Sequence, residues 1–355
     1  MEAAHSATRW SPRALLKTAL KVGLTVGAFY LLLTHRVRGP SGESVMALRA
    51  IVDYLPRIDA ATFWSFTLLA AAIKCVGIGA SMLRWHLLLR GQGIVFPFGH
   101  IVTTFLIGRF LGTFLPSTIG LDGYKLYDAA RFTERTVEAT AATVIEKGLG
   151  IIGMFLTFLV TLPLGYQILG ERAAAAALVT VPVSLAIIGA FFLVAFQPAI
   201  VTAVLDHLPF ARHGRVQSVL ARVNAAAAAY KRHKALLLAA AGLSFLVHFC
   251  TAAMYYCTAL AIGAVRADFW EVTFASTIQI VATVVSPTIA GEGVREIVQA
   301  WLLQHSIGTT ESIISAALGF WAAEALTLSG GIFYVLRGAD YRPAVQVRAG
   351  RGGRS

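Results

Sequence analysis

Six apolar stretches, each long enough for a helix to cross a lipid bilayer, constrain this chain most strongly. A helix needs about 20 apolar residues to span the hydrocarbon core. The stretches lie at 14–34, 62–83, 139–162, 173–195, 235–263 and 311–337. Charged residues make up only 14% of the sequence, whereas soluble domains carry about 25%. We therefore predict an all-α fold, a polytopic membrane helical bundle forming a single integral membrane domain over residues 1–355.

Two further apolar segments are interrupted by proline and glycine, and both carry one residue pattern. The octets TIGLDGYK (118–125) and TIAGEGVR (288–295) align without a gap, each shortly after a proline, Pro116 or Pro287. Non-helical backbone at membrane depth is tolerated only where protein or a water-filled cavity satisfies its polar groups. We therefore expect each segment to enter the membrane, break and return as a second short helix. The predicted re-entrant pairs are 96–131 and 268–305.

The distribution of basic residues also favours re-entrant pairs over simple crossings. If both interrupted segments spanned the membrane, Lys and Arg in the loops would divide equally between its two sides. With re-entrant pairs, most of them fall on the side of the N-terminus, as cytoplasmic loops require. The exceptions on the outer side are Arg36, Arg38, Arg49, Arg57, Arg172 and Arg266. We predict a multi-pass protein of the plasma membrane with cytoplasmic N- and C-termini.

This topology turns the two halves of the chain upside down relative to each other. A first repeat, 62–162, contains the pair 96–131, and a second repeat, 235–337, contains the pair 268–305. Inverted-topology repeats are typical of alternating-access transporters, whose site lies between the repeats near the bilayer midplane. The alternative is a chance match between two glycine-rich octets.

Ten charged residues lie within or beside segments at membrane depth. One such residue facing lipid at a helix centre costs about 2.5–3.5 kcal/mol on insertion scales, so functional use is the default hypothesis. We expect these residues to face one another or an aqueous cavity. They are Lys74, Arg109, Asp122, Lys125, Glu146, Lys147, Glu292, Arg295, Glu296 and Glu324.

The two octets predict an anion site at the start of each returning helix. Asp122 and Lys125 are three residues apart, as are Glu292 and Arg295, so each acid–base pair shares a helix face. Free backbone amides, the positive end of the helix dipole and a nearby base together suit a phosphate. The glycines expected to leave such amides free are Gly120, Gly123, Gly291 and Gly293. Alternatively, each pair merely neutralises itself and the glycines serve packing.

Other chemistries find little support in the sequence. There is no nucleophile elbow, phosphate-binding loop or dinucleotide fingerprint, and no His or Cys cluster has metal-ligand spacing. We therefore predict no catalytic residues, no metal and no cofactor. The net charge of +12 is explained by Lys and Arg beside anionic lipid headgroups, so we expect no nucleic-acid partner.

Three motifs resemble those of the flippase-like family named for the transmembrane region of lysylphosphatidylglycerol synthase. They are FLPSTIGLDGYKLYDAAR (114–131), TVIEKGLGI (143–151) and SPTIAGEGVREIVQAWLLQHSIG (286–308). Lys125 and Lys147 stand where the family has arginine, which keeps the charge but loses bidentate phosphate geometry. The resemblance implies a membrane domain that flips a lipid. The soluble transferase domain of the fused synthases has no counterpart here, so synthase activity is not expected.

We therefore interpret the chain as a translocator of membrane lipids with anionic or glycosylated headgroups. It would act without enzymatic activity, with a separate lipid-modifying enzyme as a potential partner and a homo-oligomer left open. The alternatives are a membrane enzyme, or enzyme subunit, acting on a lipid-linked sugar or phosphate, and a small-solute antiporter that uses Glu324. The predicted substrate-binding residues are Arg109, Gly120, Asp122, Gly123, Lys125, Glu146, Lys147, Gly291, Glu292, Gly293, Arg295, Glu296 and Glu324.

Overall fold

The six long apolar stretches all form helices in the structure, a computed structural model. It describes residues 12–38, 43–114, 119–164, 168, 172–196, 230, 233–288 and 291–336. The helices are α1 (Pro12–Thr34), α3 (Ala60–Gly91), α6 (Thr136–Thr161), α8 (Arg172–Phe196), α11 (Lys234–Ala261) and α14 (Thr309–Leu336). Among the described residues, α3, α6 and α11 are long and apolar enough to cross a membrane. The prediction of an all-α membrane protein is therefore confirmed.

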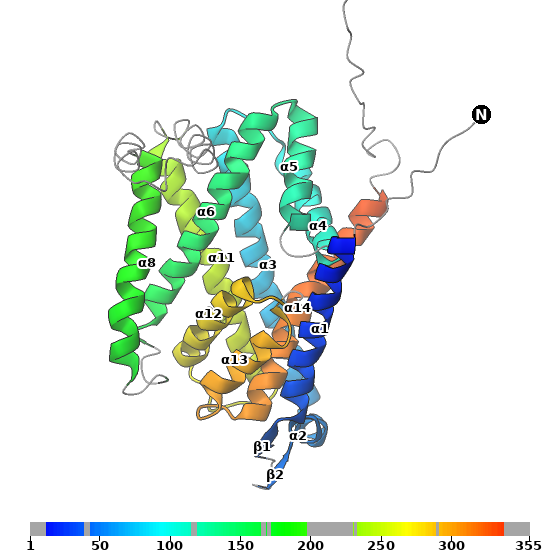
Figure 1. Ribbon diagram of the computed structural model, residues 1–355. Coiled ribbons are helices and arrows are strands. Elements are labelled where there is room, and N and C mark those ends of the chain that lie inside the picture. Colours follow the sequence, from blue (N-terminus) through cyan, green and yellow to red (C-terminus); the bar gives the residue numbers. More distant parts are fainter. Residues whose placement is uncertain are drawn as a thin grey trace, which may run out of the picture.

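The two interrupted segments fold as helical hairpins. The first consists of α4 (Phe98–Phe114) and α5 (Ile119–Thr133), and the second of α12 (Phe269–Val285) and α13 (Val294–Leu303). The two hairpins lie at opposite ends of the bundle (Figure 1). Their helices are short: α4 has 17 residues and α13 has 10, or about 25 and 15 Å at 1.5 Å per residue.

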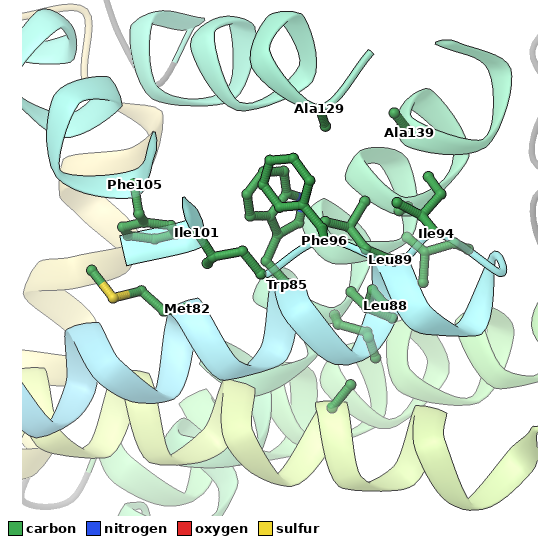
Figure 2. Packing of buried hydrophobic residues seen from close by; sticks show 14 of the residues in the cluster. Met82, Trp85, Leu88, Leu89, Ile94, Phe96, Ile101, Phe105, Ala129 and Ala139 are labelled. Carbon is green, nitrogen blue, oxygen red and sulfur yellow. The ribbon is translucent and has the colours of Figure 1, made fainter. Parts of the chain in front are cut away.

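Helices α3 and α11 pack against each other through the centre of the bundle, side by side with α6. Small residues allow the close approach, as is common between membrane helices. A Cβ added at Gly77 of α3 would lie 3.2 Å from the Cβ of Cys250, and one at Gly153 of α6 would collide with the backbone of Ser244. One apolar cluster, around Trp85, lies beside the first hairpin (Figure 2). A second lies beside the other hairpin.

Helix contacts in the two halves follow the same scheme. Each hairpin packs against the helices that flank it in sequence, α3 and α6 for the first and α11 and α14 for the second. Each also packs against a helix of the other half: α4 contacts α14, and α12 contacts α6. Each of these contacts in one half therefore has a counterpart in the other half.

A small substructure joins α1 to α3 at the end of the bundle where the second hairpin lies (Figure 1). It consists of an antiparallel ribbon of β1 (Arg36–Arg38) and β2 (Ser44–Met46), followed by α2 (Ala47–Tyr54) and the 3-10 turn η1 (Leu55–Arg57). Asp59 then caps α3, because its carboxylate accepts a hydrogen bond of 2.8 Å from the amide of Thr62.

Candidate functional site

The first octet contributes to a buried charge cluster between α5 and α6. Asp122 and Lys125 share one face of α5, with 3.8 Å between Oδ1 and Nζ, as their spacing predicts. The Lys125 side chain is only 1% exposed, and its ammonium group donates to Oε2 of Glu146, which is also buried. Glu146 comes from α6, so tertiary packing joins two charges that lie 21 residues apart in the sequence.

Arg84 also belongs to this cluster, although it was not predicted from the sequence. Its Nη2 lies 3.2 Å from Oε1 of Glu146, and its Nη1 donates to the hydroxyl of Ser244 on α11 at 2.9 Å. The apolar stretch 62–83 ends one residue before Arg84, so the sequence pattern places Arg84 outside the membrane helix. In the structure α3 continues to Gly91 and carries Arg84 into the bundle. The available signal was the continued run of apolar and helix-forming residues up to Arg90.

Aromatic rings enclose the buried ammonium group. The Nζ of Lys125 lies 4.9 Å from the ring centroid of Trp85 and 5.1 Å from that of Phe105. Both rings belong to the apolar cluster in Figure 2, where Trp85 comes from α3 and Phe105 from α4. Ring faces attract a cation, and burial of both side chains in a low-dielectric interior strengthens the ion pair with Glu146. Lys125 is therefore held firmly between acid and rings.

The cluster becomes accessible at its opposite edge. Asp122, with an 18% exposed side chain, forms a second ion pair with Lys147, whose side chain is 49% exposed. Thus the charges extend from buried Arg84 and Lys125 to a half-exposed lysine one position after Glu146. Three bases face two acids, so the cluster carries an excess of positive charge. Lys147 and Asp122 therefore form the exposed edge of the cluster.

A second acid on α5, Asp128, lies in the same hairpin and was not predicted. Its carboxylate lies 3.0 Å from Nε2 of His100 and accepts a hydrogen bond from the hydroxyl of Thr104, both on α4. Asp128 follows Lys125 by three residues, so the spacing that pairs Asp122 with Lys125 continues along the helix. That periodicity was the signal for this residue.

The second octet forms a separate buried ion pair at the start of α13. The guanidinium of Arg295 donates from Nε and Nη2 to Oε1 of Glu296 at 3.0 and 2.8 Å. Its carbon Cζ lies 4.4 Å from the ring centroid of Phe320 on α14. Glu292, the predicted partner of Arg295, is partly buried and also acts on it electrostatically. The base of each octet therefore lies beside an acid and an aromatic ring.

The structure corrects the expectation of a free amide at Gly293. Its N–H donates to Oε2 of Glu296 at 2.8 Å, which caps α13. Gly291 and Gly293 both adopt positive φ, +74° and +81°, a region that favours glycine. At the first octet, Gly120 is buried in the first turn of α5, whereas Gly123 is exposed further along the same helix.

Arg109 and Glu324 belong to neither octet. Arg109 connects the two halves of the chain through a hydrogen bond between α4 and α14. Its Nε on α4 donates to the hydroxyl of Thr327 on α14 at 3.1 Å. Glu324 belongs to α14, three residues before Thr327, and its side chain lies outside the described residues. The structure thus brings Asp122, Lys125, Glu146 and Lys147 together in one cluster and Gly291, Glu292, Gly293, Arg295 and Glu296 in another.

Long apolar helices, paired hairpins and interior ion pairs define an integral membrane protein of the polytopic helical class. The chain belongs to the family described as the lysylphosphatidylglycerol synthase TM region, whose family model matches residues 19–329. The resemblance inferred from the three motifs is thereby confirmed. No curated protein matches the sequence. Family membership indicates a lipid-related, flippase-like membrane domain.

Proposed function

We propose that this chain moves a lipid with an anionic or glycosylated headgroup between the leaflets of the plasma membrane. The two hairpins would be re-entrant pairs that enter from opposite faces, within the inverted repeats 62–162 and 235–337. Their short helices support this proposal, because about 25 and 15 Å fall below the roughly 30 Å of a hydrocarbon core. The matched contacts of α4 with α14 and of α12 with α6 support the inverted repeat.

The observation that carries the proposal is the first charge cluster, which is buried at Lys125 and open at Lys147. Its net positive charge suits an anionic headgroup. A buried ionic cluster within the membrane is costly, and a transport path for charged headgroups gives it a use. Membership in a lipid-related family supports the same class of substrate.

In this mechanism the headgroup enters at the half-exposed pair and the acyl chains stay in lipid. Phosphate or sugar oxygens would replace Asp122 as the partner of Lys147, and Lys125 would become available only when α5 moves relative to Glu146. Arg295 and the amide of Gly291 would serve the headgroup in the second half of its path. The remaining acids would balance charge; they are Glu292, Glu296 and Glu324.

Reconstitution with fluorescent lipids tests the proposal. Vesicles carry lipids labelled with nitrobenzoxadiazole in both leaflets, and external dithionite bleaches only the outer ones. We expect the purified protein to expose the inner pool to bleaching, and Lys147→Gln to slow this exposure by roughly tenfold, because one charge-assisted contact is lost. The matched control is Arg135→Gln, which breaks the exposed Arg135–Glu138 pair beside the same helix.

Two outcomes would overturn the proposal in favour of its rivals. Protein that leaves the inner pool protected for every headgroup tried, yet carries a solute into vesicles, would be an antiporter. Protein that converts a lipid-linked sugar or phosphate, with the conversion lost in folded Glu292→Gln, would be an enzyme. Equal slowing by the Arg135→Gln control would show that the first cluster has no special part.

A further inference from the structure

A polar cavity of about 720 Å³ opens at the end of the bundle that carries the β-ribbon. Its wall comes from three parts of the chain: the junction of α1 and β1, the α2–η1 segment, and the turn between α13 and α14. None of its lining residues belongs to the two ion-pair clusters. The wall residues that could interact with a ligand through a charge, an imidazole or a hydroxyl group include His35, Arg36, Arg57, His305, Thr310 and Glu311.

The charges of this wall favour an anion. Arg36 and Arg57 are permanently cationic, and they outnumber the single acid, Glu311, even when both histidines are neutral. The carboxylate of Glu311 already lies against Gly308, at the start of its own helix. Two guanidinium groups therefore remain to offer the fork of donors that matches phosphate oxygens.

An unpartnered hydroxyl group in the same wall gives independent support for a ligand. The side chain of Thr310 is buried, since the residue is only 5% exposed, and its Oγ1 has no hydrogen-bond partner among the described residues. Leaving a buried hydroxyl unsatisfied costs about 1–3 kcal/mol, so such groups usually mark a missing partner. A phosphate oxygen in the cavity would supply an acceptor.

An apolar groove of about 280 Å³ adjoins the polar cavity and shares His35, Val37, Gln304 and Thr309 with it. Elsewhere its wall is formed by α1, α13 and the first turns of α14, with the side chains of Leu31, Leu32, Ile297, Ala300, Trp301 and Ile313. Trp301 is 64% exposed, as expected for a ring beside the interface of a membrane. Cavity and groove together form one amphipathic surface.

We infer that this surface binds an anionic phospholipid, with its phosphate in the polar cavity and one acyl chain in the groove between α1 and α13. A soluble phosphate could fill only the cavity and would leave the groove unused. The site is distinct from the proposed translocation path. Its failure would leave that proposal intact, because the two rest on different residues.

Native mass spectrometry of the purified protein in detergent, titrated with three probes, tests the site. The probes are dioleoylphosphatidylglycerol, dioleoylglycerol, which lacks the phosphate, and glycerol 3-phosphate, which lacks the chains. We expect the phospholipid to bind far more tightly than either fragment. In Arg36→Gln/Arg57→Gln its apparent Kd should rise at least about tenfold, since two charge-assisted contacts are removed.

The matched control is Arg49→Gln/Arg266→Gln, which removes two exposed charges from the same end of the bundle. It should leave the Kd within about twofold. Two further variants keep the test decisive if the double arginine variant loses its cooperative melting transition. Thr310→Val removes the unpartnered hydroxyl, and Ala300→Phe fills the groove; both should weaken binding of the phospholipid.

Four results would overturn the inference. Equal losses in the control and test variants would reduce binding to general electrostatics. Equal binding of dioleoylglycerol would remove the role of the phosphate, and equal binding of glycerol 3-phosphate would make the cavity a site for soluble phosphate esters. Unchanged phospholipid binding in folded Thr310→Val and Ala300→Phe would likewise exclude this surface.

Discussion

Replacement of Glu146 by glutamine should be the most destabilising single change in the first charge cluster. Glu146 is the direct partner of both Lys125 and Arg84, and all three side chains are buried. Without its charge, Lys125 retains Asp122 at 3.8 Å as an acidic partner, while the contacts left to Arg84 within the described part of the chain are the neutral hydroxyls of Ser81 and Ser244. Removing one member of a buried ion pair costs about 3–5 kcal/mol.

The geometry also predicts how other substitutions rank beside this one. Lys125→Met leaves Glu146 with Arg84 at 3.2 Å, so it should cost less than Glu146→Gln. The double variant Lys125→Met/Glu146→Gln removes both charges of one ion pair. It therefore leaves fewer buried charges without a partner than the two single variants do together. The double variant should therefore be more stable than the sum of the singles by roughly 1–3 kcal/mol, the usual coupling of residues in contact.

Thermal melting in detergent, followed by intrinsic fluorescence, measures these differences. A loss of about 3–5 kcal/mol of stability, as expected for Glu146→Gln, lowers Tm by on the order of 10 °C. The control is Glu138→Gln on the same helix, which breaks an exposed pair with Arg135 and should leave Tm unchanged. If Glu146→Gln has the same Tm as the Glu138→Gln control, the cluster does not stabilise the bundle as described. The same conclusion follows if the stability loss of the double variant equals the sum of the losses of the two single variants.

Two further predictions concern backbone and capping. Gly293→Ala should lower Tm, because φ is +81° and the new Cβ would lie 2.5 Å from that of Ala28; Gly123→Ala, with open space around it in α5, should hold or raise Tm. Hydrogen bonds from Thr62 hold the pKa of Asp59 below its usual value, so its stabilising cap is present above the unfolded pKa of about 4 and lost as pH falls further. The Tm gap between the wild type and Asp59→Asn should therefore close only below about pH 4, and a gap that persists there would contradict the charged cap.

Local sequence patterns predicted most of the helices because their causes are local. Each apolar stretch of membrane length became a helix, and in the sequence Pro116 and Pro287 lie between the two helices of each hairpin. The shared face of Asp122 and Lys125 likewise follows from helix periodicity alone. The re-entrant insertion of these hairpins depends on the membrane itself and stays a prediction.

The sequence predicted that the buried charges face one another, but not which of them pair, because packing between distant helices determines the partners. Glu146 meets Lys125 only after α6 packs against α5, and Arg84 joins them because α3 extends beyond its apolar stretch. At the second octet the sequence suggested Glu292 as the partner of Arg295. Glu292 does act electrostatically on Arg295, and capping geometry also directs Glu296 toward both Arg295 and the amide of Gly293.

This difference gives the two similar octets unequal mechanical roles. Lys125 and its partner Glu146 belong to different helices, so any shift of α5 relative to α6 separates them. Arg295 and Glu296 are neighbours on α13 and move together. If α5 moves relative to Glu146 as proposed, the charge released from an ion pair comes from the first hairpin, whereas Arg295 would serve the headgroup while still paired with Glu296. The α5–α6 contact, rather than the symmetric glycine motifs, would then limit the rate of movement.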